Sequence, residues 1–430
     1  MQLIVEKLVY GGDGLARLPA DEHGPGKAVF VPFVLEGERI EASLIEQKRG
    51  FARGRAEAIL QATPQRVEPH CQYFRRCGGC HYQHASYEHQ LEIKAAILKE
   101  NLRRIAKLEL ETEITIHPSP PWSYRNRTRL KVRVAPEFAL GYYKFGSHEL
   151  LPVEECPVSS PLINRAIAVF WQMGRARGVP EGIYEIEFFA NADDSRLLIE
   201  ATCEPGTTVK EWADALRSSL PEIEGVSVFE ARSSSIGGAA EAELMASSGA
   251  GELAYRTDAA SYRVSAGAFF QVNRHLINEL VRIVTEGCSG HTALDLYAGV
   301  GLFSTILSRG FAQVIAVEAS QTSHADLLYN SPANVKAVRA TTTDFLRSAP
   351  GKLRPELVVM DPPRSGLGES AVQRIVGLGA PRMTYVSCDP ATASRDLAGL
   401  LSAGYRIEQA HLVDLFPQTF HLESVFHLVR

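Results

Sequence analysis

The segment that decides the fold reads Thr292-Ala-Leu-Asp-Leu-Tyr-Ala-Gly-Val-Gly301. Its apolar half predicts a buried strand over 292–296, and its glycines favour a tight turn into a helix over 301–309. This order of strand and helix repeats after residue 265. The expected strands are 292–296, 313–318, 357–361 and 383–387, the expected helices are 273–287, 301–309 and 391–404, and a hairpin follows to residue 430. The alternation predicts a doubly wound α/β domain.

Acidic residues follow the expected strands, at the sheet edge where such folds bind ligands. Glu318 ends the second strand, Asp344 follows a strand-like stretch at 335–339, and Asp361 ends the next strand. Taken singly, each acid is equally well explained as a helix N-cap. The glycine pair is also weak alone, because Ser304 stands where a G-x-G-x-x-G motif has its third glycine. Together, the acids predict a cofactor that contains adenosine.

Two strand ends carry residues suited to catalysis. Asp361 opens the sequence Asp-Pro-Pro-Arg364, whose prolines fix the backbone and hold the carboxylate rigidly; a capping turn is the alternative. Cys388 comes directly after the strand at 383–387, with a helix N-terminus behind it. That position predicts a lowered thiol pKa and raised reactivity, although a cysteine there is as often a small buried hydrophobic residue.

A cysteine-rich segment is the most specific local signal. Cys71, Cys77 and Cys80 lie within ten residues and are interleaved with glycines, which matches iron–sulfur ligation better than zinc. Cys156, followed by a proline, is the candidate fourth ligand. Cys203 and Cys288 lie in apolar surroundings and are expected in the core. A disulfide is disfavoured in the reducing cytosol, whereas a zinc site with nearby histidines (His70, His81, His84) stays open.

The part of the chain before residue 264 is expected to form two further domains. Short β-rich segments joined by Gly-rich turns over residues 1–62 predict a small closed barrel of the OB type. Residues 63–263 predict a mixed α+β domain that contains the cysteines and a helix over 87–107. Residues 233–251, rich in Ser, Gly and Ala, are expected to be loops around a weak helix or strand. The α/β domain then spans 264–430.

Charge is distributed unevenly along a chain of ordinary composition. The 430 residues are 45% hydrophobic and 22% charged, which excludes disordered, collagen-like and coiled-coil proteins. No apolar run reaches the ~18 residues of a membrane span, so a cytoplasmic protein is expected. A monomer is the expected oligomeric state. The net charge is -5, yet Lys48–Arg133 holds 17 Lys and Arg against 8 Asp and Glu. Cations at alternate positions of a strand would share one face of it, where like charges repel one another. Binding to RNA phosphates would relieve that repulsion. The alternative is a purely structural face that is exposed to solvent. These cations are Arg125, Arg127, Arg129, Lys131 and Arg133.

Several motifs, in this order and spacing, resemble one known family. They are Cys71-x5-Cys77-Gly-Gly-Cys80, Phe269-Phe-Gln-Val-Asn273, Asp295-Leu-Tyr-Ala-Gly-Val-Gly301, Asp361-Pro-Pro-Arg364, Ser387-Cys-Asp-Pro390 and His421-Leu-Glu-Ser424. The chain resembles the S-adenosylmethionine-dependent RNA uracil-C5 methyltransferases that carry an N-terminal TRAM domain and an iron–sulfur cluster, such as the bacterial 23S rRNA enzymes. The resemblance covers nearly the whole chain and implies a Rossmann-like methyltransferase domain after the barrel and the α+β domain.

The resemblance also implies roles for particular residues. Cys388 is the implied nucleophile and Glu423 the implied base. The implied ligands of a [4Fe-4S] cluster are Cys71, Cys77, Cys80 and Cys156, and the implied cofactor contacts are Gln271, Tyr297, Glu318, Asp361 and, on the adenine side, Asp344. Leu302 departs from the pattern, because some relatives carry an asparagine there.

The implied reaction has a consistent chemical logic. A Cys388 thiolate adds to uracil C6, C5 then takes the methyl group, and Glu423 removes the C5 proton before the thiolate leaves. The base must leave its stack, and Phe269 is available to line its pocket. Ribosomal RNA is the expected substrate. The alternatives are a tRNA uracil-C5 methyltransferase and a non-catalytic iron–sulfur RNA-binding protein.

Overall fold

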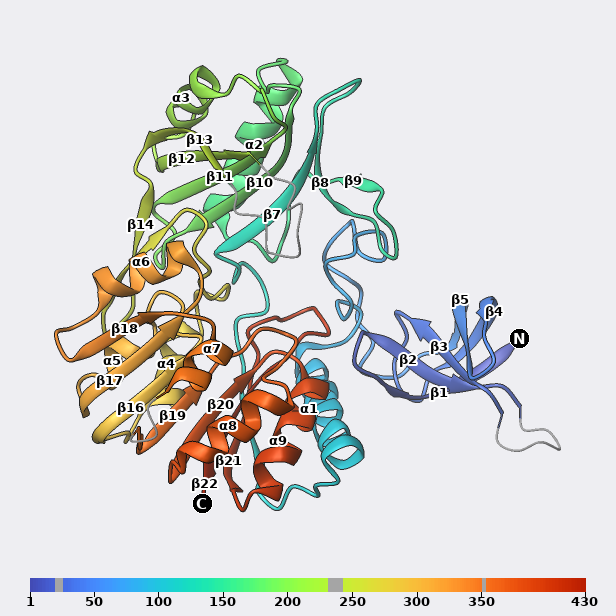
Figure 1. Ribbon diagram of the computed structural model, residues 1–430. Coiled ribbons are helices and arrows are strands. Elements are labelled where there is room, and N and C mark those ends of the chain that lie inside the picture. Colours follow the sequence, from blue (N-terminus) through green and yellow to red (C-terminus); the bar gives the residue numbers. More distant parts are fainter. Residues whose placement is uncertain (20–25, 231–242, 350–352) are drawn as a thin grey trace.

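The computed structural model describes residues 1–19, 26–230, 243–349 and 353–430. The strands form a closed five-stranded barrel and sheets of seven, two and eight strands. Figure 1 shows the barrel to one side of the molecule, the seven-stranded sheet at the top and the eight-stranded sheet at the bottom. No helix in these described ranges is long and apolar enough to cross a membrane.

The N-terminal barrel is confirmed. Its strands follow the order β1-β2-β3-β5-β4. They are β1 (Gln2–Leu8), β2 (Asp13–Arg17), β3 (Ala28–Pro32), β4 (Arg39–Gln47) and β5 (Phe51–Gln61). Small aliphatic residues such as Val5, Val29, Val31 and Ile40 fill its interior. The aromatic residues of the barrel lie outside this core: Phe30 packs against Phe51 of the neighbouring strand, and Phe33 packs against Phe74 and Phe145 of other segments.

Residues 87–117 pack against the C-terminal sheet, although they precede the boundary expected at residue 264. The expected helix divides into α1 (Tyr87–Asn101) and a π-helical turn, η1 (Leu102–Ala106), which ends at left-handed Lys107. The apolar side of α1 joins the same core as the strands of that sheet. Strand β6 (Ile114–His117) pairs in parallel with β21 (Arg406–Val413) and forms the edge of the sheet.

The middle of the chain is the expected α+β unit. Its seven strands are β7 (Arg127–Arg133), β8 (Ala139–Tyr143), β9 (Leu150–Pro152), β10 (Ile183–Ala190), β11 (Leu197–Cys203), β12 (Ile223–Glu230) and β13 (Glu243–Gly249). Helices α2 (Pro161–Arg175) and α3 (Lys210–Ser218) contribute to a core that includes Cys203, as expected. Of the uncertain stretch at 233–251, the part up to 242 lies outside the described residues, and β13 follows as the edge strand.

The C-terminal sheet confirms the doubly wound prediction. Its order is β18-β17-β16-β19-β20-β22-β21-β6, and the first five strands run parallel. The strands are β16 (Gly290–Leu296), β17 (Phe311–Glu318), β18 (Val335–Arg339), β19 (Leu357–Met360), β20 (Arg382–Ser387) and β22 (Glu423–Val429), with β21 as above. The helices are α4 (Ile277–Thr285), α5 (Ser304–Leu307), α6 (Gln321–Asn330), α7 (Thr342–Ser348), α8 (Glu369–Leu378) and α9 (Pro390–Ser402). A hairpin of β14 (Glu252–Arg256) and β15 (Ser261–Ser265) precedes them.

Two cores lie on opposite faces of this sheet. One includes α1, α7, α8 and α9, and the other includes α4, α5 and the β14–β15 hairpin. Both faces are therefore covered, and ligands reach the sheet at the ends of its strands.

Candidate active site at the carboxyl ends of the strands

The strand order brings the predicted nucleophile and base together. Strand β20 ends at Ser387, and antiparallel β22 begins at Glu423. Ser387 pairs with Ser424 in this ladder, so the next position along places Cys388 opposite Glu423. Asp361 follows β19, the other neighbour of β20. Hence three predicted site residues far apart in sequence meet at one edge of the sheet.

The expectation of a lowered Cys388 pKa is wrong. Burial raises the pKa of this thiol to about 12, and the carboxylates of Glu423 and Asp361 raise it further than Arg364 lowers it. The helix N-terminus behind it is capped by Asp389, whose side chain accepts from the first free amide groups of α9 at 3.0 and 2.9 Å. Cys388 is therefore a protonated thiol in this cleft, with carboxylates facing it as proton acceptors.

The two carboxyl groups of the cleft are poised to exchange protons. Burial raises the pKa of Asp361 to about 7. Glu423 is 4% exposed, and both burial and the charge of Asp361 raise its pKa well above the usual range. Arg364 opposes these shifts on Glu423. Two interacting buried acids of this kind are suited to general acid–base catalysis near neutral pH.

The nearby histidines do not compete for the role of base. His421 is a weak base, because burial and the charge of Arg364 lower its pKa to about 3. Arg364 Nη2 lies 3.4 Å from His421 Nε2. His427 contacts Thr384, in the first half of β20, and lies away from the strand end that carries Cys388.

The Gly-rich turn after β16 has the backbone that its sequence requires. Tyr297, Gly299 and Gly301 all have positive φ, of 64°, 55° and 94°. The Gly299 N–H donates to Glu318 Oε2 at 2.9 Å, and the Ser320 N–H donates to Oε1 at 2.7 Å. Glu318 thus fixes two turns, and each of its oxygens keeps a lone pair for a ligand.

Sequence reasoning missed Asp295, the last residue but one of β16. Its side chain is fully buried, Oδ2 accepts from the Ser304 hydroxyl, and Oδ1 has no hydrogen-bond partner. Burial raises its pKa to about 7. The signal was an acid inside an otherwise apolar strand just before the Gly-rich turn.

The remaining residues predicted to contact the cofactor or the RNA nucleobase differ in their surroundings. Gln271 is buried, and it follows Phe270, which packs on Tyr255 with ring centroids 4.5 Å apart. Phe269, one residue earlier, is 63% exposed. Asp344 is exposed in the first turn of α7, where it accepts from the Thr341 hydroxyl and pairs with Arg347. Its contacts are those of a local helix-start residue.

The four predicted cluster cysteines line one cavity. Cys71, Cys77, Cys80 and Cys156 surround it together with Arg125 and Tyr142. The thiols of Cys77 and Cys80 have pKa values raised to about 11 and about 12, because burial penalises the thiolate. Within the described ranges, no three His, Cys, Asp or Glu side chains are arranged to hold a single metal ion. His81 and His84 point elsewhere, the first to the Phe420 ring and the second to the Val34 carbonyl.

Arg125 does not lie where the alternating pattern predicted. It precedes β7 and lines the cysteine cavity, and its Nε is buried without a hydrogen-bond partner. In the described part of the chain, no carboxylate forms an ion pair with it, and its titratable neighbours are thiols and tyrosine hydroxyls. A buried cation without a counter-charge is costly. The cavity therefore favours an anionic occupant, and thiolates bound to a cluster would supply that charge.

The premise of unrelieved repulsion on β7 is wrong. Glutamates on the neighbouring strands β10 and β11 neutralise its cations. Arg127 pairs with Glu187 and Glu200, Arg129 pairs with Glu187, and Lys131 pairs with Glu185. Arg127 is buried, whereas Arg129 and Arg133 are exposed. Their role toward RNA stays a prediction.

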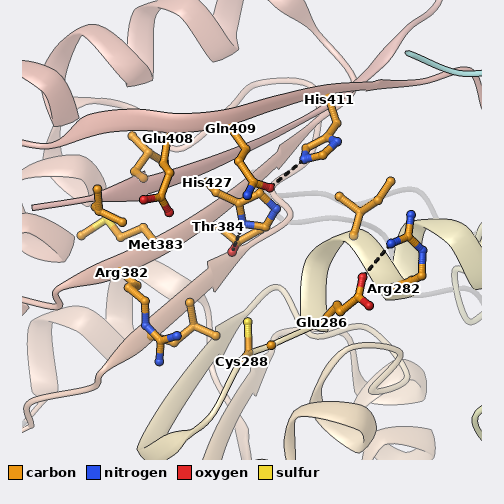
Figure 2. Close-up of a pocket in the computed structure, with 15 residues that line it drawn as sticks. Arg282, Glu286, Cys288, Arg382, Met383, Thr384, Glu408, Gln409, His411 and His427 are labelled. Carbon is orange, nitrogen blue, oxygen red and sulfur yellow. Dashed lines mark hydrogen bonds and ion pairs between the residues drawn. The ribbon is translucent and has the colours of Figure 1, made fainter. Parts of the chain in front are cut away.

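A second cavity, of about 360 Å³, lies at the opposite edge of the C-terminal sheet. Figure 2 shows its polar lining, in which His427 bonds to Thr384, His411 to Gln409 and Arg282 to Glu286. Cys288 also lines it, so this cysteine is only partly buried. No residue predicted for the site lies there.

The doubly wound sheet, its Gly-rich turn and its strand-end acids define the class of this protein, an enzyme with the methyltransferase fold. The same architecture is found in the solved structure of a Pyrococcus abyssi tRNA (uracil-54, C5)-methyltransferase in complex with S-adenosyl-L-homocysteine. The two share 23% identity and a TM-score of 0.77, and the match covers 100% of both chains.

The family model of tRNA (uracil-5-)-methyltransferase matches residues 86–430, and the chain belongs to this family of methyltransferases. An uncharacterised RNA methyltransferase of Aquifex aeolicus is 32% identical over 434 residues, which cover 99% of this chain and 97% of the relative. A 23S rRNA (uracil(1939)-C(5))-methyltransferase RlmD of Halomonas elongata is 30% identical over 453 residues, covering 99% and 89%.

Proposed function

We propose that this protein transfers a methyl group from S-adenosylmethionine to C5 of a uridine in 23S rRNA, through a covalent bond between Cys388 and uracil C6. The observation that carries the proposal is the pairing of β20 with β22, which sets the Cys388 thiol opposite the buried Glu423 carboxyl. A relative that is 30% identical over nearly the whole chain is a 23S rRNA enzyme, whereas the tRNA enzyme of similar structure is 23% identical, which favours ribosomal RNA.

S-adenosylmethionine, when bound, supplies an electrophilic methyl group on a sulfonium. Tyr297, Glu318, Asp361 and Gln271 are the proposed contacts. The first three lie at the carboxyl ends of neighbouring parallel strands, and Gln271 is buried in the segment between β15 and α4. Glu318 suits the ribose, since both of its oxygens are already oriented by backbone amides. Asp344 is the least supported contact, because its carboxylate is engaged in its own helix turn.

The chain's own residues supply the acid–base steps. The Cys388 thiol gives its proton to a facing carboxylate, and its sulfur bonds to uracil C6, so that C5 becomes nucleophilic. After C5 has taken the methyl group, Glu423 removes the C5 proton, the bond between sulfur and C6 breaks, and the aromatic ring returns. The raised pKa of Glu423 makes its carboxylate a stronger base than an exposed glutamate.

We also propose a [4Fe-4S] cluster on Cys71, Cys77, Cys80 and Cys156. The support is a shared cavity lined by four thiols and by Arg125, whose Nε is buried without a hydrogen-bond partner. A cluster spreads its ligands around several iron atoms, so the sulfur atoms need not converge on one point. The proposed role is structural, because the four ligands come from two segments separated in sequence.

RNA binding is proposed for the barrel at 1–62 and the α+β unit at 63–263, with catalysis at 264–430. The exposed cations Arg129 and Arg133 are the stronger phosphate contacts of the predicted set, and Lys131 is partly exposed. Arg125 and Arg127 are less suited, since they face the interior. Exposed Phe269 lies two residues before Gln271 and is placed to stack on a displaced base. The enzyme is proposed to act as a cytoplasmic monomer.

The target is tested by incubating the purified protein and labelled S-adenosylmethionine with unmodified 23S rRNA and, separately, with unmodified tRNA. The expected result is 5-methyluridine at one or more positions of the rRNA, absent with Cys388→Ala. Methylation of tRNA alone would contradict the proposed target and would favour the alternative, a tRNA uracil-C5 methyltransferase. Full activity of Cys388→Ala would contradict the mechanism.

A further inference from the structure

A tyrosine of the N-terminal barrel reaches the catalytic loops. Tyr10 lies in the turn between β1 and β2, and its hydroxyl donates to the Cys388 carbonyl oxygen at 3.2 Å. Its ring meets the Phe420 ring edge-on, with centroids 5.3 Å apart. One side chain thus touches both the loop that carries the nucleophile and the loop that leads to Glu423.

The barrel turn is held closely against this place. Gly12 has a φ of +94°, and a Cβ there would lie 3.1 Å from the His81 side chain, so the turn packs directly on the cysteine segment. The His81 ring also packs on Phe420, the ring that Tyr10 contacts, with centroids 4.6 Å apart. The His81 and Tyr82 amides both donate to the Gln418 carbonyl, at 2.9 and 3.0 Å. Tyr10 therefore sits in a packed junction and has few alternative positions.

We infer that Tyr10 is a positioning residue for methyl transfer: it fixes the distance between the Cys388 loop and the Glu423 loop. The inference rests on the proposed function, since it assumes that these two loops carry the nucleophile and the base. It adds a role for the barrel that RNA affinity alone does not include.

The chemistry of Tyr10 favours positioning over proton transfer. Burial, and then the charge of Asp389, raise the pKa of its phenol well above the usual value. The hydroxyl therefore stays protonated and keeps donating to the Cys388 carbonyl throughout the pH range of the enzyme. Its loss should scale the rate equally at every pH and leave the shape of the pH profile unchanged.

The same side chain connects catalysis to a groove on the barrel. Tyr10 lines a cavity of about 500 Å³ between the barrel and α1, together with Lys7, Phe30 and Arg104. Lys7 and Arg104 both pair with Glu100 of the same lining, so the aromatic side chains, rather than free positive charge, are what suit this groove to unpaired RNA. A nucleotide held there would contact the residue that fixes the nucleophile loop.

The test uses Tyr10→Phe in the full chain, which keeps the ring contact with Phe420 and removes only the hydroxyl. The matched control is Tyr405→Phe, because the Tyr405 hydroxyl also donates to a backbone carbonyl, that of Ala380 at 2.7 Å, at the far end of the sheet. Both variants are compared with wild type in kcat, in KM for RNA and S-adenosylmethionine, and in the rate of covalent capture by RNA that contains 5-fluorouridine. With fluorine in place of hydrogen at C5 there is no C5 proton to remove, so the thiolate cannot leave and the covalent adduct is trapped.

For Tyr10→Phe we expect kcat and the capture rate to fall together by roughly two- to tenfold, the range that one hydrogen bond supports. Both KM values and the pH profile should keep their wild-type form, and Tyr405→Phe should keep wild-type kcat. Equal kcat losses in the two variants would overturn the inference, as would a rise in KM for RNA without a change in kcat. Failure of the proposed function has another signature, because wild-type protein would then form no adduct at all.

Discussion

At the scale of single residues, Asp295 shows that the ligand-binding edge of the sheet contains a group that destabilises the folded state when it ionises. It is a fully buried carboxyl with one hydroxyl donor and one unpartnered oxygen, and Asp361 and Glu318 add negative charge nearby. Its pKa of about 7 exceeds the ordinary value of 3.8. The folded state therefore holds a proton that the unfolded state releases, and stability falls as pH rises between these two values.

We predict that Asp295→Asn flattens this part of the stability profile. Below pH about 4 both states of the wild-type carboxyl are protonated, so the stability contribution is complete there and is lost as pH rises through about 7. The asparagine side chain of the variant does not titrate, so the remaining dependence of stability on pH comes from Asp361. Denaturant unfolding at pH 5 and pH 8 measures the difference. A variant with the full wild-type loss of stability between these pH values would contradict the assignment.

At the scale of elements, the segment before β7 joins the cysteine cavity to the catalytic half. Arg125 exchanges backbone hydrogen bonds with Val158 and Ser160, next to Cys156. On its other side, the Asn126 amide donates to the Val272 carbonyl, just after Gln271. A change of charge in the cavity therefore acts on a strand that contacts the proposed cofactor site.

We predict that Arg125→Met loses iron from the purified protein, because the negative charge of the proposed thiolate-bound cluster would lose its buried counter-charge. Iron content per chain and visible absorption are the measurements, and neither depends on methylation. Arg129→Met is the matched control. Arg129 lies on the same stretch of chain as Arg125, but it is exposed and pairs with Glu187. Equal iron content in the two variants would refute a role for Arg125 at the cavity.

Sequence patterns predicted the elements whose signals are local. The Gly-rich turn, the strand ends and the barrel were found because glycine positions and apolar runs report directly on backbone and burial. The helix expected at 301–309 is only α5, because the glycine turn extends to Phe303, and the helix expected at 87–107 changes to a π-turn at Leu102. Pairing of β6 with β21, and neutralisation of β7 by glutamates, depend on partners distant in sequence. No local pattern encodes these partners.

At the scale of the whole molecule, the catalytic loops are held by segments from the entire first third of the chain. Gln90 and Lys94 of α1, Tyr82 beside the cysteines and Tyr10 of the barrel all contact residues at or just before the Glu423 loop or the Cys388 loop. The position of Cys388 directly after a strand was visible in the sequence, and the role of Glu423 was implied by the family resemblance; both roles stay predictions. The supports of their loops, about 300 or more residues away, were not visible in the sequence.

One buried ion pair is central to this assembly. Lys94 Nζ lies 2.6 Å from Asp414 Oδ1, and both side chains are fully buried. We predict that Asp414→Ala lowers the free energy of unfolding by about 3 to 5 kcal/mol, because it leaves the Lys94 charge without a partner. Chemical denaturation measures this, and the double variant Lys94→Met, Asp414→Leu should recover part of the loss. A single variant as stable as wild type would show that the pair does not hold α1 to the catalytic half.

The central claim is that Cys388 forms the covalent bond and Glu423 ends it. The most direct measurement is mass spectrometry of Glu423→Gln after incubation with S-adenosylmethionine and unmodified 23S rRNA. Because an amide cannot remove the C5 proton, the account predicts a methylated nucleotide that stays attached to the peptide containing Cys388, with turnover lost. Wild-type turnover by this variant, or attachment to a residue other than Cys388, would contradict it.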